Sequence, residues 1–246
     1  MTVPTTPSGP FSGHSRVHDM GGQPGGPVPS KAADGPVFAE DWHARALAIT
    51  IAAGGLGKWN LDTSRHARER LPAADYSAYS YYEKWLAGLA TLLVEQGLVQ
   101  AEELRRGHAL EGGRQTAHIP LTPAPLTPEQ VETALRRGGP SRRPDTVPPR
   151  FSLGQKVTAR TPDAVARQPG GHTRLPGYIA GCTGVIISHH HSHVLPDSNA
   201  HGLGEVAEHL YGVKFTAAEV WSGADHPEDE LCLDLWDSYL LAAEPS

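Results

Sequence analysis

Hydrophobic residues recur at helical spacing in the first half of the chain, beginning at about residue 39. In EDWHARALAITIAAG (40–54) the apolar residues stand at i, i+4, i+7 and i+11, so they share one side of a helix that Gly54-Gly55 ends. These apolar residues are Trp42, Ala46, Ile49 and Ala53. The spacing predicts an amphipathic helix at the start of a helical domain, which we expect over residues 37–111.

Further helices are expected within the same domain. Asn60 and Asp62 are candidate N-caps for a helix that runs to about Leu71, because their side chains can accept from free amides and Pro72 follows directly. The strongest helical pattern is SAYSYYEKWLAGLATLLVEQG (77–97), which ends at a glycine, and a short helix is expected in EELRR (102–106).

Two segments lack a hydrophobic period. Residues 1–36 are rich in Pro, Gly, Ser and Thr, so this extended arm cannot offset its ordering entropy by burial and would be disordered or wrap a partner. Residues 112–149 are interrupted by many prolines and form a tether. It carries one helix, which begins at a capping box over 127–130 with Pro at the first helical position.

After Pro149 the period changes to two. The stretches FSLGQKVTAR, GYIAGCTGVIIS, LYGVKFTAAEVW and ELCLDLW are typical of short strands separated by turns. Four or five such strands in fewer than a hundred residues favour a small barrel. The pattern therefore predicts an α+β protein, with an N-terminal arm and helical domain followed by a C-terminal SH3-like β-barrel over 150–246.

Composition narrows the classes of function. A net charge of −6 without a dense Lys/Arg run argues against a nucleic-acid partner. The longest apolar stretch, LAGLATLLV, is too short to cross a bilayer, and the N-terminus does not resemble a signal peptide, so we expect a cytoplasmic protein. Its two cysteines, Cys182 and Cys232, lack the spacing of a zinc framework and are expected to be reduced thiols.

A histidine run is the most conspicuous candidate for chemistry. The segment ISHHHSHVLPDSNAHG (187–202) holds five of the 14 histidines, and on a strand His189, His191 and His193 would share one face. However, alternate side chains on a strand lie about 7 Å apart, too far for three to meet one metal ion without a bend. We therefore expect an exposed polar strand end with at most adventitious nickel or zinc binding.

Nucleophilic catalysis has little support, since the chain contains neither a GxSxG elbow nor a phosphate-binding glycine loop. Two arginines are of more interest. Arg65 lies four positions after Leu61 and four before Glu69, on one helical face, and Arg174 lies in the turn GGHTRLPGY. Taken by themselves, these arginines are most simply surface residues paired with carboxylates, and Tyr81 and Trp85 are simply core aromatics.

Nine stretches, taken in order, resemble the β subunit of nitrile hydratase. The likeness runs from about residue 17 to 243 and is loosest in the proline-rich tether. The matching stretches are VHDMGG (17–22), PVFAEDWHARALA (36–48), NLDTSRHARERL (60–71), YYEKWL (81–86), LLVEQGL (92–98), LTPEQV (126–131), GHTRLPGY (171–178), PDSNAHGLGE (196–205) and LCLDLWDSYL (231–240). One such fragment would be weak support, but nine in the right order are strong.

The resemblance implies a subunit that carries no catalytic metal of its own. In that family nitriles are hydrated to amides at a cobalt(III) or iron(III) ion, which the α subunit holds through partly oxidised cysteines. The chain would be active only with that partner, as a heterodimer that assembles further into a heterotetramer, and its N-terminal arm would wrap the α subunit. The run at 189–193 is richer in histidine than the family pattern and has no assigned role.

The resemblance also assigns site residues. Arg65 and Arg174 match the β-subunit arginines that reach the oxidised cysteine oxygens, for which a planar guanidinium fork is well suited. Leu61, Tyr81 and Trp85 match positions that wall the nitrile pocket, and Glu69 and His172 match polar positions behind it. Ser64 replaces a bulkier apolar residue and is expected to widen the pocket, and Lys84 stands where the family often has histidine.

Three alternatives remain open. Thiocyanate hydrolase shares the family's architecture, but its helical and barrel halves occur on separate chains. A metal-delivery protein would use the histidine run to hold cobalt or nickel, with His189, His190, His191 and His193 as ligands. A non-catalytic interaction module would tolerate replacement of both arginines by lysine.

Overall fold

The structure is a computed structural model that describes residues 16–21, 36–110 and 126–243. They form two compact units, one made of residues 36–110 and 126–139 and the other of residues 16–21 and 140–243. Most of the expected arm and the first part of the expected tether lie outside the described residues. The expected domain boundaries therefore stay predictions.

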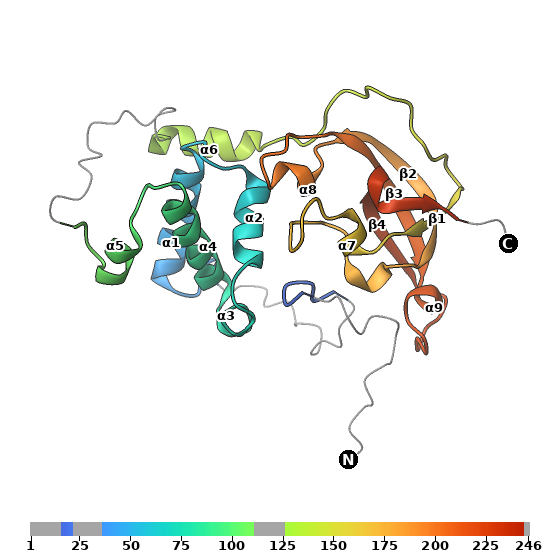
Figure 1. The fold of residues 1–246 in the computed structure, drawn as a ribbon, viewed down its shortest axis with the longest axis horizontal. Helices are drawn as coiled ribbons and strands as arrows, with labels where there is room; N and C mark the ends of the chain where they lie inside the picture. The colour runs from blue at the N-terminus through green and yellow to red at the C-terminus, as the bar shows by residue number, and fades with distance from the viewer. Residues whose placement is uncertain (1–15, 22–35, 111–125, 244–246) are drawn as a thin grey trace, which may run out of the picture. The chain divides into compact units, whose positions relative to one another are not determined.

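The first unit is helical, as its hydrophobic period predicted (Figure 1). Its helices are α1 (Asp41–Gly54), α2 (Leu61–Glu69), α3 (Ala73–Ala78), α4 (Tyr81–Glu95), α5 (Ala101–Arg106) and α6 (Pro128–Arg137). Helix α4 packs against both α1 and α2. The residues most deeply buried in this unit are Ala46, Ala67, Leu89 and Leu92.

The helix boundaries follow their capping chemistry. Asn60 caps α2, since its Oδ1 accepts from the Thr63 amide at 2.8 Å. Ser80 and Glu83 form a capping box at the start of α4, where the Ser80 amide donates to Glu83 at 2.7 Å. The expected long helix from residue 77 is therefore divided. Residues up to Ala78 belong to the separate helix α3, because Tyr79 is extended.

The second unit contains one antiparallel sheet of five strands in the order β4-β3-β2-β1-β5. Its strands are β1 (Lys156–Ala159), β2 (Thr183–His193), β3 (Glu208–Thr216), β4 (Glu230–Trp236) and β5 (Leu240–Ala242). Short helices connect them: α7 (Pro162–Val165), α8 (Pro196–Asn199) and α9 (Ala217–Val220), with 3₁₀ turns η2 (Gly177–Ile179) and η3 (Asp237–Tyr239).

The mixed helix-and-sheet fold is confirmed, but the five described strands are not closed into a barrel, so the SH3-like barrel stays a prediction. Strands β4 and β5 are the two edges of the sheet and do not pair with each other. Alternation of apolar and polar residues reports only which side of a strand faces the core. Closure depends on strand tilt and stagger, which alternation does not encode.

The sheet covers a hydrophobic core on one of its faces. In β4 the exposed Cys232 and Asp234 alternate with the more buried Leu231, Leu233 and Leu235, as the sequence predicted. The core combines strand residues with residues from the connections. It includes Phe151, Ile179, Ile186, Leu195, Tyr211, Val213, Phe215, Leu235, Tyr239 and Leu240.

None of the helices in the described parts of the chain is long and apolar enough to cross a membrane.

Candidate functional site

Helix α2 presents Leu61, Ser64 and Arg65 along one side, at i, i+3 and i+4. Leu61, the first residue of the helix, is exposed, and Ser64 and Arg65 are partly buried. The Arg65 guanidinium lies 3.0 Å from the carboxylate of Asp62, whose side chain is only 9% exposed. This ion pair orients the guanidinium but leaves part of it, 38% of the side chain, open to a partner.

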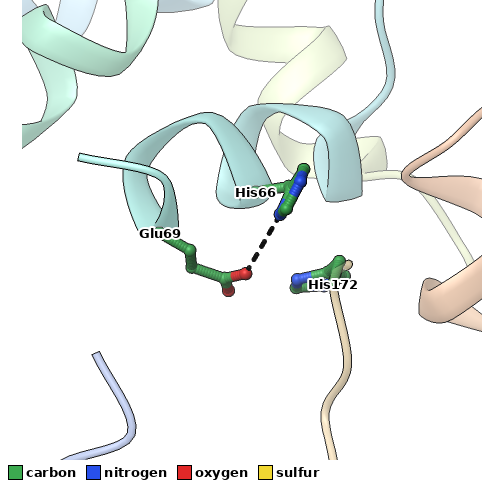
Figure 2. A group of neighbouring side chains, drawn as sticks. All are labelled: His66, Glu69 and His172. Atoms are coloured by element: carbon green, nitrogen blue, oxygen red, sulfur yellow. Dashed lines mark ion pairs between the residues drawn. The ribbon is translucent and has the colours of Figure 1, made fainter. Parts of the chain in front are cut away.

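Glu69 lies one turn beyond Arg65 and pairs with His66 on the same helix. Their side chains approach to 3.6 Å between His66 Nδ1 and Glu69 Oε2 (Figure 2). Both side chains are largely buried, at 10% and 14% exposure. His66 was not among the predicted site residues.

Helix α4 begins with the aromatic pair that the sequence singled out. The rings of Tyr81 and Trp85 lie 5.5 Å apart between centroids, as expected for residues at i and i+4. Tyr81 is 64% exposed, so its hydroxyl is free to face a ligand or a partner. Trp85 is partly buried. The two side chains therefore project together, and the exposed Tyr81 is not a core aromatic.

Arg68 connects the two helices and was missed by the sequence analysis. Its guanidinium carbon lies 4.7 Å above the Trp85 ring, and its Nε donates to the Ser64 carbonyl at 3.1 Å. Burial lowers the pKa of Arg68, opposed by the field of Tyr81. Its place at i+7 from Leu61 is the sequence signal that could have identified it.

Arg174 lies in the loop between α7 and η2, and its side chain is exposed. The hydroxyl of Tyr239 fixes this loop through two hydrogen bonds. The Arg174 amide donates to the Tyr239 hydroxyl at 3.1 Å, and the Thr173 hydroxyl donates to the same oxygen at 3.3 Å. Tyr239 in turn donates to Asp197 in a short hydrogen bond.

The Tyr239–Asp197 pair is almost completely buried, at 0% and 1% exposure. Burial raises the pKa of Asp197, and burial together with the Asp197 carboxylate raises the pKa of Tyr239 well above its usual value. Tyr239 therefore stays a neutral donor. A hydroxyl that accepts two hydrogen bonds and donates one is fully used, so the position of the Arg174 backbone is closely specified.

The N-terminal segment 16–21 supports the other side of the same loop. The carboxylate of Asp19 accepts from the Gly177 amide at 2.7 Å, and the Arg16 guanidinium donates to the Gly171 carbonyl. A side chain at Gly21 would collide with the Tyr178 ring, at 2.6 Å from the nearest ring carbon. Residues 16–21 and the stretch GHTRLPGY thus pack together, although they are about 150 residues apart in the sequence.

His172, the other predicted residue of this loop, is completely buried. Its backbone amide donates to His201 Nε2 at 2.9 Å, and His201 Nδ1 lies 3.0 Å from the side-chain amide of Gln168. A buried imidazole next to a buried carboxylate fits a role in supporting the loop.

These residues form two sets of groups, each held on a rigid support. One set is the α2/α4 face with Arg65, Tyr81 and Trp85, and the other is the braced loop with Arg174. None of them lines a cavity of about 450 Å³ that lies near the end of α4. That cavity is lined by Val94, Gly97, Leu98, Val99, Gln100, Ala101 and Glu103. Exposed guanidinium and phenol groups outside a cavity are suited to completing a site on another molecule.

Comparisons with known proteins agree with this interpretation. A family model described as "Nitrile hydratase beta subunit, N-terminal" matches residues 15–134, and "Nitrile hydratase beta subunit, C-terminal" matches residues 140–242. The "Nitrile hydratase subunit beta" of Pseudomonas putida is 38% identical over 92% of this chain and 99% of its own. The "Low-molecular weight cobalt-containing nitrile hydratase subunit beta" of Rhodococcus rhodochrous is 35% identical over the same shares.

Among solved structures, a chain of the recombinant apo-enzyme "Thiocyanate hydrolase (SCNase)" from Thiobacillus thioparus matches 48% of this chain and 99% of its own. Its TM-score is 0.37 and its sequence identity is 21%, and this likeness carries no functional argument.

Proposed function

Because the chain belongs to the nitrile hydratase β-subunit family, we propose that it completes the active site of an enzyme that hydrates nitriles to amides. The observation that carries the proposal is the pair of arginines, Arg65 and Arg174, each presented outward on a rigid support. The same positions were assigned to this role from the sequence stretches NLDTSRHARERL and GHTRLPGY.

The catalytic metal is proposed to lie on the partner α subunit. The residues of this chain do not fit a thiolate-rich metal site, because Cys182 is buried, Cys232 is exposed on β4, and both are free. Burial and the field of Glu219 raise the pKa of Cys182 to about 11, which makes its thiolate rare at neutral pH. A cobalt(III) or iron(III) ion on the partner would polarise the nitrile carbon as a Lewis acid.

We propose that both arginines donate to oxidised cysteine oxygens of the partner. A guanidinium stays charged and offers two parallel N–H groups, which match a sulfinate or sulfenate better than the point charge of lysine. Asp62 keeps the Arg65 fork in one orientation, and Tyr239 does the same for the backbone of Arg174. Such charge-assisted bonds also offset the cost of desolvating the anions in an interface.

The substrate side of the site is proposed to be walled by Leu61, Tyr81 and Trp85. Leu61 and Trp85 would exclude water from the nitrile, and the exposed Tyr81 hydroxyl would donate a hydrogen bond. Ser64, one residue before Arg65, leaves more room than an apolar side chain would. Glu69, which pairs with His66, would lie behind these pocket residues and supply a polar contact there.

The active species is proposed to be a complex with one α subunit, with two such heterodimers pairing into a heterotetramer. We also propose that it works in the cytoplasm, since two free cysteines suit a reducing compartment. The test is coexpression with an α subunit that carries a cysteine cluster. The complex is expected to hydrate nitriles, and the isolated chain is expected to be inactive. Turnover by the isolated chain would overturn the proposal.

The arginine role is tested by Arg65→Lys and Arg174→Lys within that complex. Each is expected to lower turnover by about 10–100-fold, the range seen when groups that orient a metal's ligands are changed. Arg70→Lys is the matched control, because Arg70 lies at the other end of α2 and pairs with Glu95 at 2.8 Å. Full activity of the Arg65→Lys, Arg174→Lys double variant would instead identify a non-catalytic interaction module.

A further inference from the structure

The loop that carries Arg174 is fastened at both of its ends by one segment from the N-terminal part of the chain. In the stretch GHTRLPGY (171–178), Gly171 and Gly177 each lie three positions from Arg174, one before it and one after it. The backbones of both glycines hydrogen-bond to side chains of the segment 16–21. The segment therefore bridges the base of the loop, and the exposed Arg174 stands midway between the two fastened positions.

A single turn supplies both contacts. The Arg16 carbonyl accepts from the Asp19 amide at 2.9 Å, the hydrogen bond of a β-turn, which keeps these two residues close together. At one end of the turn the Arg16 guanidinium donates to the Gly171 carbonyl. At the other end the Asp19 carboxylate accepts from the Gly177 amide at 2.7 Å. Both bonds are charge-assisted and so stronger than bonds between neutral groups, and we call residues 16–19 the N-terminal clamp.

The N-terminal segment approaches the loop so closely that two positions have no room for a side chain. A Cβ at Gly177 would lie 2.6 Å from the Asp19 carboxylate oxygen that accepts its amide proton. A Cβ at Gly21 would lie 2.6 Å from the Tyr178 ring. That ring stacks on Trp221 at 6.0 Å between centroids, and Trp221 packs against the core of the sheet unit. The segment and the loop are therefore closely fitted to each other.

The centre of the loop is anchored by the core of the sheet unit. The Arg174 amide donates to the Tyr239 hydroxyl, and the next residue, Leu175, is 3% exposed. With its ends held by the N-terminal clamp and its centre held by buried groups, the loop backbone is fixed on both sides of Arg174. Loss of the clamp would therefore let the Arg174 guanidinium shift, although its other anchor remained.

The clamp lies within the stretch 1–36, which we expected to be disordered or to wrap a partner. The described residues of that stretch, 16–21, pack on the sheet unit of the same chain. Arg16 makes a further contact there, 3.8 Å from the carboxylate of Asp163, and its side chain is only 22% exposed. Ordering a polar segment costs conformational entropy, and here that cost is offset by bonds to the arginine loop.

We propose that Arg16 and Asp19 are positioning residues for Arg174. The inference rests on the function proposed above, in which the Arg174 guanidinium donates to oxidised cysteine oxygens of the partner. A planar fork meets such oxygens with two N–H groups only when its backbone is correctly placed, and a displacement of about 1 Å can cost about 100-fold in rate. Arg16 and Asp19 act through the loop backbone and not by touching the substrate.

The first experiment measures hydrogen exchange of the full-length chain by mass spectrometry. Asp19→Ala leaves the Gly177 amide without its acceptor, so peptides that cover residues 171–178 are expected to exchange at least about 10-fold faster. Asp145→Ala is the matched control, because it removes another aspartate that accepts a backbone amide, that of Ser192 on β2 at 2.8 Å. It is expected to leave exchange in residues 171–178 unchanged.

The second experiment measures nitrile turnover of the same variants in the complex with the α subunit. Asp19→Ala is expected to lower kcat by about 10–100-fold. KM is expected to change by less than about twofold, because the proposed pocket wall lies on α2 and α4. Asp19→Asn is expected to keep most of the turnover, since its side-chain oxygen can accept from the Gly177 amide in the same way. Asp145→Ala is expected to leave turnover unchanged.

Gly177→Ala tests the same bond from the side of the loop. The added methyl group would displace the Asp19 carboxylate, so this variant is expected to reproduce the faster exchange and the lower kcat of Asp19→Ala. The double variant is expected to be no worse than either single variant, because both changes remove one shared interaction. Far-UV circular dichroism verifies that every variant keeps its fold.

The outcomes separate this inference from the proposed function. Ordinary exchange rates in Asp19→Ala, or faster exchange with an unchanged kcat, would overturn the positioning role. So would an equal loss of turnover in Asp19→Asn or Asp145→Ala, or additive losses in the double variant. Absence of turnover in the unchanged complex would instead overturn the proposed function, and hydrogen exchange would still show whether the N-terminal clamp fixes the loop.

Discussion

The amide of Arg174 lies 3.1 Å from the hydroxyl of Tyr239, a residue 65 positions later that the solvent does not reach. This contact joins the exposed loop that carries Arg174 to the core of the sheet unit. The same hydroxyl donates to the buried Asp197. The position of the loop backbone therefore depends on Tyr239 and Asp197 together.

Tyr239→Phe is expected to leave the chain folded but to lower nitrile turnover of the complex. The substitution removes the acceptor of the Arg174 amide and the donor to Asp197, which costs about 1–3 kcal/mol of stability. Steady-state kinetics of the complex and urea unfolding of the chain measure the two effects. We expect kcat to fall more than KM rises, since the loop is displaced while the substrate wall on α2 and α4 is unchanged.

Tyr211→Phe is the control for that experiment. Tyr211 is equally buried, and its hydroxyl accepts from the Arg150 amide at 3.0 Å, away from the arginine loop. It is expected to lower stability by a similar amount without a comparable loss of turnover. If both variants lost turnover equally, the lower turnover of Tyr239→Phe would result from reduced stability of the chain and not from displacement of the Arg174 loop.

Asn60→Ala is expected to destabilise the start of α2, which carries Leu61 and Arg65. The Asn60 side chain accepts from the Thr63 amide at 2.8 Å and from the Thr63 hydroxyl at 3.0 Å. Loss of an N-cap costs about 0.5–2 kcal/mol. Urea unfolding measures this loss, and Asn60→Asp, which keeps a capping oxygen, should restore most of it. An unchanged free energy of unfolding for Asn60→Ala would contradict the assigned cap.

The helical half of the fold could be predicted well because its determinants are local. Hydrophobic spacing, caps and terminal glycines lie within a few residues of the helices they specify, as Asn60 and Gly54 do. The sheet was predicted less completely, since closure and the short strand β5 depend on pairing between distant segments. The residues GYI (177–179) also form a 3₁₀ turn where a strand was expected.

In the candidate site, too, contacts within one helix were predictable from the sequence and contacts between distant segments were not. Leu61 and Arg65 share one face of α2, and Tyr81 and Trp85 share one face of α4, so each of these pairs was predictable from the spacing. The support of Arg174 by Tyr239 and Asp197 was not, because it joins three segments across long sequence separations.

Gly88→Ala is expected to destabilise the contact between α4 and α2. A Cβ at position 88 would lie 2.6 Å from Arg68 Cγ and 3.3 Å from the Arg68 backbone nitrogen, so the helices must separate. Overpacking of this kind costs about 1–3 kcal/mol, more than the roughly 1 kcal/mol that alanine gains in helix propensity. Thermal unfolding measures the difference. Gly54→Ala is the control, because a Cβ there meets nothing within 4 Å, and it is expected to be neutral or stabilising.

Asp145→Asn is expected to lower the free energy of unfolding at pH 6 and to matter progressively less as the pH falls. His191 and Ser192 hold the folded-state pKa of Asp145 below its unfolded value of about 3.9. The stabilisation from a depressed carboxyl pKa is complete above the unfolded value and is lost as the pH drops through the folded one. Urea unfolding of the unchanged chain and of Asp145→Asn between pH 6 and pH 3 measures the difference in their free energies of unfolding, which should narrow below about pH 4.

Asp234→Asn is the control. It alters a single exposed contact with His190, so its free energy of unfolding should differ less from that of the unchanged chain. If the difference for Asp145→Asn stayed constant over this range, the carboxylate charge would not stabilise this end of β2.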